Sequence, residues 1–317
     1  MADTLGSGSL QFWPRKRAEK VFPSVNWKII ISGNQEKKGL LGFITYKVGM
    51  KSAYVKDLTA DSLTKDKNII VPVTILEAPP AKILTVRFYK QGKVTGEVFS
   101  QNLNKELKKV VKLPKNKTKK FEDYKDYDDI RILLYSEAKK TNIKHVPDIA
   151  EVALGGNLEE KKKFCQDNLD KELNFSDFAQ KNDLVDFRGL TKGKGLTGPV
   201  KRFGISLRAH KSEKGQRGPG SLGPWHPARV TFYTPISGQM GMFHRPIYNQ
   251  KVLDYGKITE KNINPSSGWK NYGNIKTDYV VVLGSVHGPQ KRQVLLTAPL
   301  RRTKKQEKKK FNLIELR

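Results

Sequence analysis

The stretch DFRGLTKGKGLTGPVKRFGISLRAHKSEKGQRGPGSLGPWHPARVTFY, residues 186–233, governs how this chain can fold. Glycine and proline interrupt it so often that most of it cannot be helix or regular strand. It contains ten basic residues but only two acidic ones, Asp186 at its edge and Glu213 inside. Apolar runs occur only at 203–207 and 230–233, so the stretch cannot bury itself. We therefore expect it to be either disordered alone or organised by a polyanion.

The composition of this stretch favours nucleic acid as the polyanion. Glycine lets the backbone approach a phosphate closely, and Lys and Arg neutralise the phosphate charge. Trp225, His226 and Phe232 offer flat faces on which bases can stack. The alternative is a solvated flexible loop, with His226 packed in a turn. The interleaving of glycine, aromatic and basic residues over the whole stretch favours nucleic acid.

The charge of the whole chain points the same way but is unevenly spread. The 317 residues have a net charge of +29, a field that attracts polyanions. Residues 121–187 contain sixteen Asp and Glu against ten Lys and Arg, whereas the rest of the chain has a net charge of +35. This asymmetry predicts a solvent-facing acidic insert on a body embedded in nucleic acid. The length allows a substantial core in one large or two ordinary domains.

Other classes of protein find little support in the sequence. The single cysteine, Cys165, excludes an intrachain disulfide and fits a reducing compartment, and we expect it to be packing filler rather than a nucleophile. No apolar run approaches the ~18–20 residues of a membrane helix, and we expect no signal peptide. The five histidines are scattered without metal-ligand spacing.

A glycine motif at 193–198 also fails to indicate a cofactor. It spells G-x-G-x-x-G, but Pro199 follows at once and no strand–helix–strand unit surrounds it, as a dinucleotide site would require. We expect no cofactor, no metal, no small-molecule substrate and no catalytic residue. The chain is predicted not to be an enzyme.

The strand pattern predicts a mainly β body. Strands are expected at 39–50, 69–77, 81–89, 94–99, 130–135, 251–258, 279–283 and 293–297. Helices are expected at 148–154 and 158–173, the second capped by Asn157, with 175–179 continuing the pair. Closely spaced strands without intervening helices favour an antiparallel barrel or sandwich.

The chain is predicted to comprise five parts. They are an N-terminal extended arm at 1–38, a discontinuous β-barrel at 39–99 and 184–300, an acidic α/β insert at 100–183, a basic glycine-rich extension at 188–246, and a basic C-terminal tail at 301–317. In the arm, Phe12, Trp13, Phe22 and Trp27 alternate with cations, as in a segment laid on RNA. The alternative is that these aromatics pack on the domain.

Seven segments together are highly specific. They are GSLQFWPRKRA at 8–18, GFITYKVGM at 42–50, VPVTILEAPP at 71–80, GLTKGKGLTGPVKRFGI at 189–205, GSLGPWHPARV at 220–230, GQMGMFHR at 238–245 and GSVHGPQKR at 284–292. Through them the chain resembles the large-subunit ribosomal protein L-three family, in its archaeal and eukaryotic branch. The resemblance implies a mainly β fold: a six-stranded translation-factor-like β-barrel with an inserted α/β domain and long basic rRNA-binding extensions. The opening MADTLGSGS lacks that branch's basic residues, and the insert is short.

The resemblance also implies a function. It is that of a structural constituent of the large ribosomal subunit, which binds and helps fold large-subunit rRNA early in assembly, with a basic finger reaching towards the peptidyl transferase centre. The implied partners are large-subunit rRNA and neighbouring large-subunit ribosomal proteins, without a membrane, and the implied location is the ribosome in the cytoplasm. Trp225 matches the tryptophan at the finger tip, His210 a histidine in the finger, and Gln239 lies in the matched GQMG segment.

The residues expected to bind RNA combine the basic pattern with this resemblance. They are Arg15, Lys16, Arg17, Arg188, Lys192, Lys194, Lys201, Arg202, Arg208, His210, Lys211, Lys214, Arg217, Trp225, His226, Arg229, Gln239, His244, Arg245, Lys291 and Arg292. Two other classes stay open: an rRNA-acting enzyme such as a methyltransferase, which needs a cofactor pocket, and a DNA-binding module, which needs a groove-reading element. For Trp225 the alternative is an indole that plugs the protein's own barrel.

Overall fold

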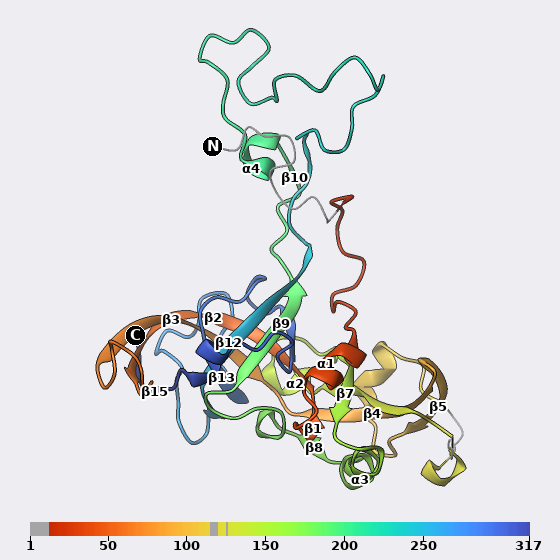
Figure 1. Cartoon of the computed structure of the whole chain (residues 1–317). Helices are drawn as coiled ribbons and strands as arrows, with labels where there is room; N and C mark the ends of the chain where they lie inside the picture. Colours follow the sequence, from red (N-terminus) through yellow and green to blue (C-terminus); the bar gives the residue numbers. More distant parts are fainter. Residues whose placement is uncertain (1–12, 115–119, 125) are drawn as a thin grey trace. The chain divides into compact units, whose positions relative to one another are not determined.

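A computed structural model describes residues 13–114, 120–124 and 126–317 of the chain (Figure 1). The residue contacts divide the chain into two compact units. The basic unit comprises the described residues 13–21 together with Leu190–Arg245. The core unit comprises Phe22–Gly189 and Pro246–Arg317. Phe12 of the expected arm, the opening nine residues and the linker residues 115–119 lie outside the described residues.

The larger sheet of the core unit closes on itself. Its strands are β2 (Gly42–Asp57), β3 (Asn68–Ala78), β9 (Leu184–Leu190), β12 (His244–Lys257), β13 (Asp278–Leu283), β14 (Gln293–Thr297) and β15 (Phe311–Leu316). Their order is β14-β9-β12-β13-β3-β2-β15, and β14 also pairs with β2, so six strands form a ring. Tyr279 of β13 lies opposite Glu77 of β3, so the strands expected at 69–77 and 279–283 are direct neighbours in one sheet. The prediction of a mainly β fold is confirmed.

The second sheet contains three strands of the acidic segment, together with strands that precede it. Its strands are β1 (Gly39–Leu40), β4 (Ala81–Lys90), β5 (Lys93–Phe99), β6 (Asp129–Ser136), β7 (Ile149–Gly155) and β8 (Glu172–Leu173). The order is β1-β7-β6-β4-β5, with β8 paired to β4. The strands at 81–99, expected in the barrel, therefore pair with β6 instead. A boundary at residue 99 cannot be drawn from local sequence, because a strand's pattern does not say which neighbour it bonds to.

The segment at 148–154, expected to be helical, is strand β7. It lies between β1 and β6 and is buried along most of its length. Short apolar runs do not distinguish a buried strand from a buried helix, since neither shows a clear period. The helical prediction was wrong for that reason.

Helix α3 (Leu158–Asn168) begins where the sequence predicted. The Glu160 carboxylate accepts the backbone N–H of Asn157 at 3.0 Å and so caps the first turn. The helix ends five residues earlier than expected, since β8 takes residues 172–173 into the sheet, and 175–177 form a single 3-10 turn, η3. Cys165 is buried on this helix, and burial raises the pKa of its thiol to about 12. The cysteine is therefore packing material, as predicted.

One hydrophobic core joins the two sheets. Phe43 and Leu296 of the ring belong to the same buried cluster as Val86 and Ile130 of the second sheet. Helix α1 (Trp27–Gly33) adds Trp27, which is only 3% exposed. The acidic segment thus folds as part of the core unit and contributes to the same buried cluster as the ring.

The C-terminal tail is built into the core unit as well. After helix α5 (Lys304–Lys308), strand β15 pairs antiparallel with the outer half of β2, with Phe311 opposite Asp57. Figure 1 shows β15 beside the outer end of the β2–β3 hairpin. The prediction of a separate tail at 301–317 therefore holds for its basic composition but not for its structure.

Candidate nucleic-acid interface

A short two-stranded ladder forms the base of the basic unit. Strand β10 (Leu196–Thr197) pairs with β11 (Gly238–Gln239), so residues on either side of the long glycine-rich segment are held together. The backbone N–H of Lys194 donates to Met240 O at 2.9 Å, and Met242 N–H donates to Lys192 O at 3.3 Å. The side chains of Lys192 and Lys194 are exposed on this ladder. The backbone is therefore fixed here while its cations face solvent.

A small arginine cluster lies beside the ladder. Helix α4 (Pro199–Phe203) ends at Gly204, whose φ of 72° suits glycine. The Phe203 ring lies 4.4 Å from Arg15 Cζ and 5.1 Å from Arg202 Cζ. The Arg202 guanidinium also donates to Gln239 O at 3.1 Å and to Ile236 O at 2.9 Å. Arg202 is thus partly a structural tie, whereas Lys201 next to it is exposed.

The electrostatics of this cluster favour an anion. Burial, and then the nearby charge of Arg245, lower the pKa of Arg15. Burial, and then Arg15, lower the pKa of Arg202 in the same way. The described residues of the basic unit contain fourteen Lys and Arg but only Glu19 and Glu213 as acids. Like charges held this close repel one another, and a bound phosphate would relieve that repulsion.

The long segment between α4 and β11 has almost no regular structure. In the described chain, residues 204–237 form neither helix nor strand. Local bonds shape its first part: Arg208 N–H donates to Gln216 O at 3.1 Å, the Arg208 guanidinium donates to Pro219 O, and Gln216 Nε2 donates to His210 O at 2.8 Å. The side chains of His210, Lys211, Lys214 and Arg217 are exposed.

The tip of this segment presents its aromatic side chain to solvent. Every residue from 221 to 230 is exposed, and the Trp225 indole is 88% exposed. Behind the tip, Thr234 is buried and its hydroxyl donates to Leu222 O at 3.0 Å. The alternative in which Trp225 plugs the protein's own barrel is contradicted by this exposure. His226 and Arg229 are exposed beside it.

The first described residues lie along the same unit. Ala18 N–H donates to Met242 O at 3.0 Å, and the His244 ring bonds to Lys20 O at 2.6 Å. Trp13 packs edge-on against Tyr233 at 4.9 Å between ring centroids. Lys16 and Arg17 are exposed.

The aromatics farther along the expected arm behave differently. Phe22 packs against the core cluster and Trp27 is buried in it. For these two residues the alternative of packing on the domain is correct, because they lead into and belong to helix α1. The extended arm therefore ends well before the expected boundary at residue 38.

Three further expected RNA contacts lie in or next to the core unit's ring of strands. Arg188 is partly buried on β9, where its Nε donates to Thr297 Oγ1 at 3.2 Å, and burial lowers the pKa of its guanidinium. Lys291 is exposed in the turn before β14, while Arg292 is partly buried. Of the three, Lys291 is the side chain most available to a polyanion.

Two residues near the end of the basic segment are held by their own backbone. Gln239 Nε2 donates to Met240 O at 3.2 Å and to Gly241 O at 3.1 Å. Arg245 Nη1 donates to His244 O at 2.8 Å, and its Cζ lies 5.1 Å from the Phe243 ring centroid. These contacts shape the ladder region, a role that the basic pattern of the sequence did not indicate.

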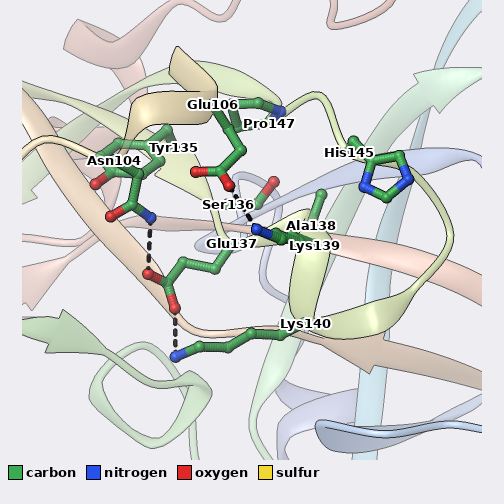
Figure 2. A pocket seen from close by; sticks show the side chains of 10 residues that line it. All are labelled: Asn104, Glu106, Tyr135, Ser136, Glu137, Ala138, Lys139, Lys140, His145 and Pro147. Carbon is green, nitrogen blue, oxygen red and sulfur yellow. Dashed lines mark hydrogen bonds and ion pairs between the residues drawn. The ribbon is translucent and has the colours of Figure 1, made fainter.

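A cavity of about 400 Å³ lies in the core unit between η1 (Lys105–Lys109) and α2 (Ala138–Thr141) (Figure 2). Figure 2 shows its two carboxylates already engaged. Glu106 pairs with Lys139 at 2.8 Å, and Glu137 bonds with Lys140 and with Asn104 Nδ2. Carboxylates neutralised in this way are poor acids or bases. Within the described residues no three His, Cys, Asp or Glu gather as metal ligands, and no described helix is long and apolar enough to cross a membrane.

A partly buried histidine near the ring of strands, whose two ring nitrogens are shielded from solvent, gives the core unit a measurable response to acid. Neither ring nitrogen of His287 has a hydrogen-bond partner among the described residues, and Lys47 donates to the carbonyl oxygens of Val286 and Gly288 on either side. Burial, helped by the charge of Lys47, lowers the pKa of His287 to about 4.

We expect the unfolding free energy to fall as the pH drops from about 6.5 to 4. The unfolded chain takes up a proton on His287 near pH 6.5, whereas the folded chain resists it until about pH 4, so stability is intact above 6.5 and declines by up to about 3 kcal/mol below it. Urea unfolding at a series of pH values measures this decline. His287→Gln should remove most of it; an equally steep decline in that variant would assign the effect to other groups.

Comparison with known proteins shows which family this chain belongs to. The model of the family described as Ribosomal protein L3 matches residues 3–131 and 121–316. The chain belongs to the ribosomal protein L3 family. It is 38% identical to the large ribosomal subunit protein uL3 of Methanocaldococcus jannaschii over 309 residues, covering 93% of this chain and 90% of the relative. It is 39% identical to uL3 of Methanobrevibacter smithii over 316 residues, covering 95% and 93%.

A third relative, uL3 of Picrophilus torridus, is 34% identical over 306 residues, covering 94% of this chain and 92% of the relative. The match therefore includes both the core unit and the basic unit. Members of the L3 family are structural ribosomal proteins rather than enzymes, so the prediction that this chain is not an enzyme is confirmed.

Proposed function

We propose that this chain is a structural constituent of the large ribosomal subunit that binds and helps fold large-subunit rRNA early in assembly. The basic unit supports this proposal most. It contains fourteen Lys and Arg but only two acidic residues, and its residues 204–237 form neither helix nor strand. Such a segment gains little from its own packing and is suited to being organised by phosphates. The protein is located in the ribosome in the cytoplasm, beside neighbouring large-subunit proteins.

The architecture serves this function in two parts. We assign the ring β2-β3-β13-β12-β9-β14 to the six-stranded translation-factor-like barrel. We assign β6, β7, β8 and α3 to the acidic α/β insert, whose sheet also takes in β1, β4 and β5. The basic extension departs from the ring at the end of β9 and returns to it in β12. A closed ring of strands is rigid because each strand is hydrogen-bonded to a neighbour on both sides.

The expected RNA-binding residues divide into two groups by their surroundings. The exposed side chains are free to meet phosphates or bases; they are Lys16, Arg17, Lys192, Lys194, Lys201, His210, Lys211, Lys214, Arg217, Trp225, His226, Arg229 and Lys291. The others are partly buried; they are Arg15, Arg188, Arg202, Arg208, Gln239, His244, Arg245 and Arg292. All of these except Arg292 also make a side-chain hydrogen bond within the protein. Mutation of the second group is therefore expected to affect folding as well as binding.

The tip tryptophan is proposed to pack on rRNA bases close to the peptidyl transferase centre. Two prolines flank the Trp225–His226 pair, so the turn is stiff and holds the indole outward. Stacking of one base on an aromatic side chain is worth ~1–3 kcal/mol.

Replacing Trp225 separates this role from folding. We expect Trp225→Ala to leave the melting temperature of the free protein nearly unchanged, because the indole is 88% exposed. Assembled subunits with this variant should show impaired peptidyl transfer or tRNA binding. Trp27→Ala is the matched control: its indole is 3% exposed, so the change should cost ~3–5 kcal/mol of folding stability. A destabilised Trp225→Ala protein with normal subunit activity would refute the proposed role.

A further inference from the structure

A second concentration of positive charge lies on the core unit, after the last strand of the ring. Residues 300–310, the C-terminal strap, contain seven Lys and Arg and one acidic residue, Glu307. All seven cations are exposed. None of them belongs to the basic unit, and none is among the residues expected to bind RNA. The strap is therefore a charged surface that the proposed function has not used.

Hydrogen bonds hold the strap to the core unit at both ends. At its start, Leu300 N–H donates to Asp186 Oδ2 at 2.8 Å. At its end, Lys310 N–H donates to Thr59 Oγ1 at 3.1 Å. The backbone is thus positioned before anything binds, so that little conformational entropy is lost when its side chains meet a partner.

Helix α5 in the middle of the strap gathers three lysines on one face. Lys304 and Lys308 are four residues apart, and Lys305 and Lys308 are three apart, spacings at which the side chains of a helix are neighbours. The helix backbone is tied to the ring, since Glu307 O accepts a hydrogen bond from the Lys251 ammonium at 3.2 Å. These three lysines form the lysine face of the strap, which stays open to solvent.

The charge of the strap is not balanced within the protein. Arg301 Cζ lies 5.1 Å from the Tyr248 ring centroid and Arg302 donates to Asn34 Oδ1, but no described carboxylate forms an ion pair with any of the seven cations. Lysines of the acidic segment, by contrast, contact carboxylates at 2.5–2.9 Å; they are Lys139, Lys140 and Lys144. Like charges on one helix face repel one another, and a bound polyanion would relieve this repulsion.

The strap offers charge without a surface for recognising bases. Residues 300–310 contain no aromatic side chain and no exposed large apolar one, whereas Trp225 and Phe232 are exposed in the basic unit. A lysine ammonium is a point charge that suits a phosphate but does not by itself specify a sequence. Protein interfaces are depleted of lysine and depend on aromatic or apolar anchors, which the strap lacks. Duplex RNA fits better, because it presents phosphates and conceals its bases.

We propose that the C-terminal strap is a second RNA-binding surface, which holds the phosphate backbone of duplex RNA without reading its sequence. The lysine face makes the principal contacts, and Lys309 and Lys310 extend them towards β15. The proposal rests on the proposed function in one respect, that RNA is the partner of this chain. The two surfaces then differ in what they bind: the strap takes paired RNA, and the exposed rings of the basic unit suit unpaired bases.

Neutralising the lysine face of the full-length chain tests the proposal. Lys304, Lys305 and Lys308 are replaced together by Gln, and filter binding at a series of salt concentrations is measured with two RNA duplexes of equal length and unrelated sequence. We expect the slope of log K against log salt to become flatter by about 2–3 on both duplexes, since three phosphate contacts are lost. A single-stranded RNA of the same length should show a smaller change, because the basic unit still binds it.

Two further variants control for charge and for folding. Replacing Lys139, Lys163 and Lys171 by Gln removes the same charge from exposed positions in the acidic segment, and it should keep the parent slope. Replacing the lysine face by Arg keeps its charge and should also keep the parent slope. All these side chains are exposed, so the melting temperature of each variant should equal that of the parent.

The outcomes separate the strap proposal from the proposed function. A parent-like slope on the duplexes in the Gln variant of the lysine face would assign these lysines to solvent or to an acidic protein, and it would overturn the strap proposal alone. A change on only one duplex would show sequence reading, and an equal change on the single strand would show that pairing is irrelevant; either result overturns the proposal as stated. If the parent does not bind large-subunit rRNA, the proposed function fails and the strap proposal fails with it.

Discussion

Replacing Lys192, Lys194 and Lys201 together by Ala is expected to flatten the salt dependence of binding to large-subunit rRNA. Each phosphate contact contributes about 0.7–0.9 to the slope of log K against log salt, so three contacts contribute about 2–3. When salt is raised from 50 to 200 mM, the affinities of the parent and the variant both fall. The fold-loss of the variant should be roughly 20 to 40 times smaller than that of the parent. Filter binding at a series of salt concentrations measures both slopes.

Arg202 is left unchanged in this variant. Arg202, next in the sequence, holds two backbone carbonyl groups, so its loss would disturb the fold of the basic unit as well as its charge. A control of equal charge is Lys139, Lys163 and Lys171 to Ala, all exposed in the acidic segment. We expect that control to keep the parent slope. An unchanged slope in the Lys192, Lys194 and Lys201 variant would mean that these cations face solvent in the complex.

Gly241→Ala is expected to disrupt the ladder at the base of the basic unit. Gly241 has a φ of 75°, and a Cβ there would lie 1.9 Å from the backbone oxygen of Lys192. The backbone must move, because a carbonyl in the ladder cannot turn aside as a flexible side chain can. The positive φ alone adds a strain of about 1–2 kcal/mol. We expect affinity for rRNA to fall at least as much as in the lysine variant, since every cation beyond the ladder loses its fixed base.

A neighbouring glycine provides the control for this change. A Cβ on Gly193 would meet only Met242, at 3.9 Å from its Cβ, and the backbone there is not in the left-handed region. Gly193→Ala should therefore leave both amide-exchange protection of the ladder and rRNA affinity as they are. Equal protection of residues 192–196 and 238–242 in Gly241→Ala and the parent would show that the ladder tolerates the Cβ.

Local sequence predicted most of the strands but not their partners. The β-branched runs at 279–283 and 293–297 read directly as strands because their side chains suit a pleated, buried surface. The pairing of β4 with β6 depends on residues more than forty positions apart, such as Val86 and Ile132, and no local pattern reports it. For the same reason the acidic segment was expected to stand apart, although its buried residues belong to the same cluster as those of the ring.

For the candidate interface, too, composition predicted the charged surface but not the contacts that its residues make within the protein. Charge and glycine content predicted the basic unit. They were also sufficient to predict which lysines are exposed in it. What composition could not show is which polar groups are already used within the protein. Gln239 and Arg188 look like RNA contacts in sequence, yet each donates to a nearby protein acceptor. That information comes from partners brought together only by the fold.

The closing pair of the ring sets an order of events during synthesis. Phe43 of β2 lies opposite Leu296 of β14, which is made 253 residues later. At elongation rates of about 5–20 residues per second, β2 waits roughly 13–50 s for this partner. The basic segment between β9 and β12 emerges within that interval. Its cations are therefore exposed while the ring is still open. Under the proposed function, RNA can bind the chain before the chain completes its own fold.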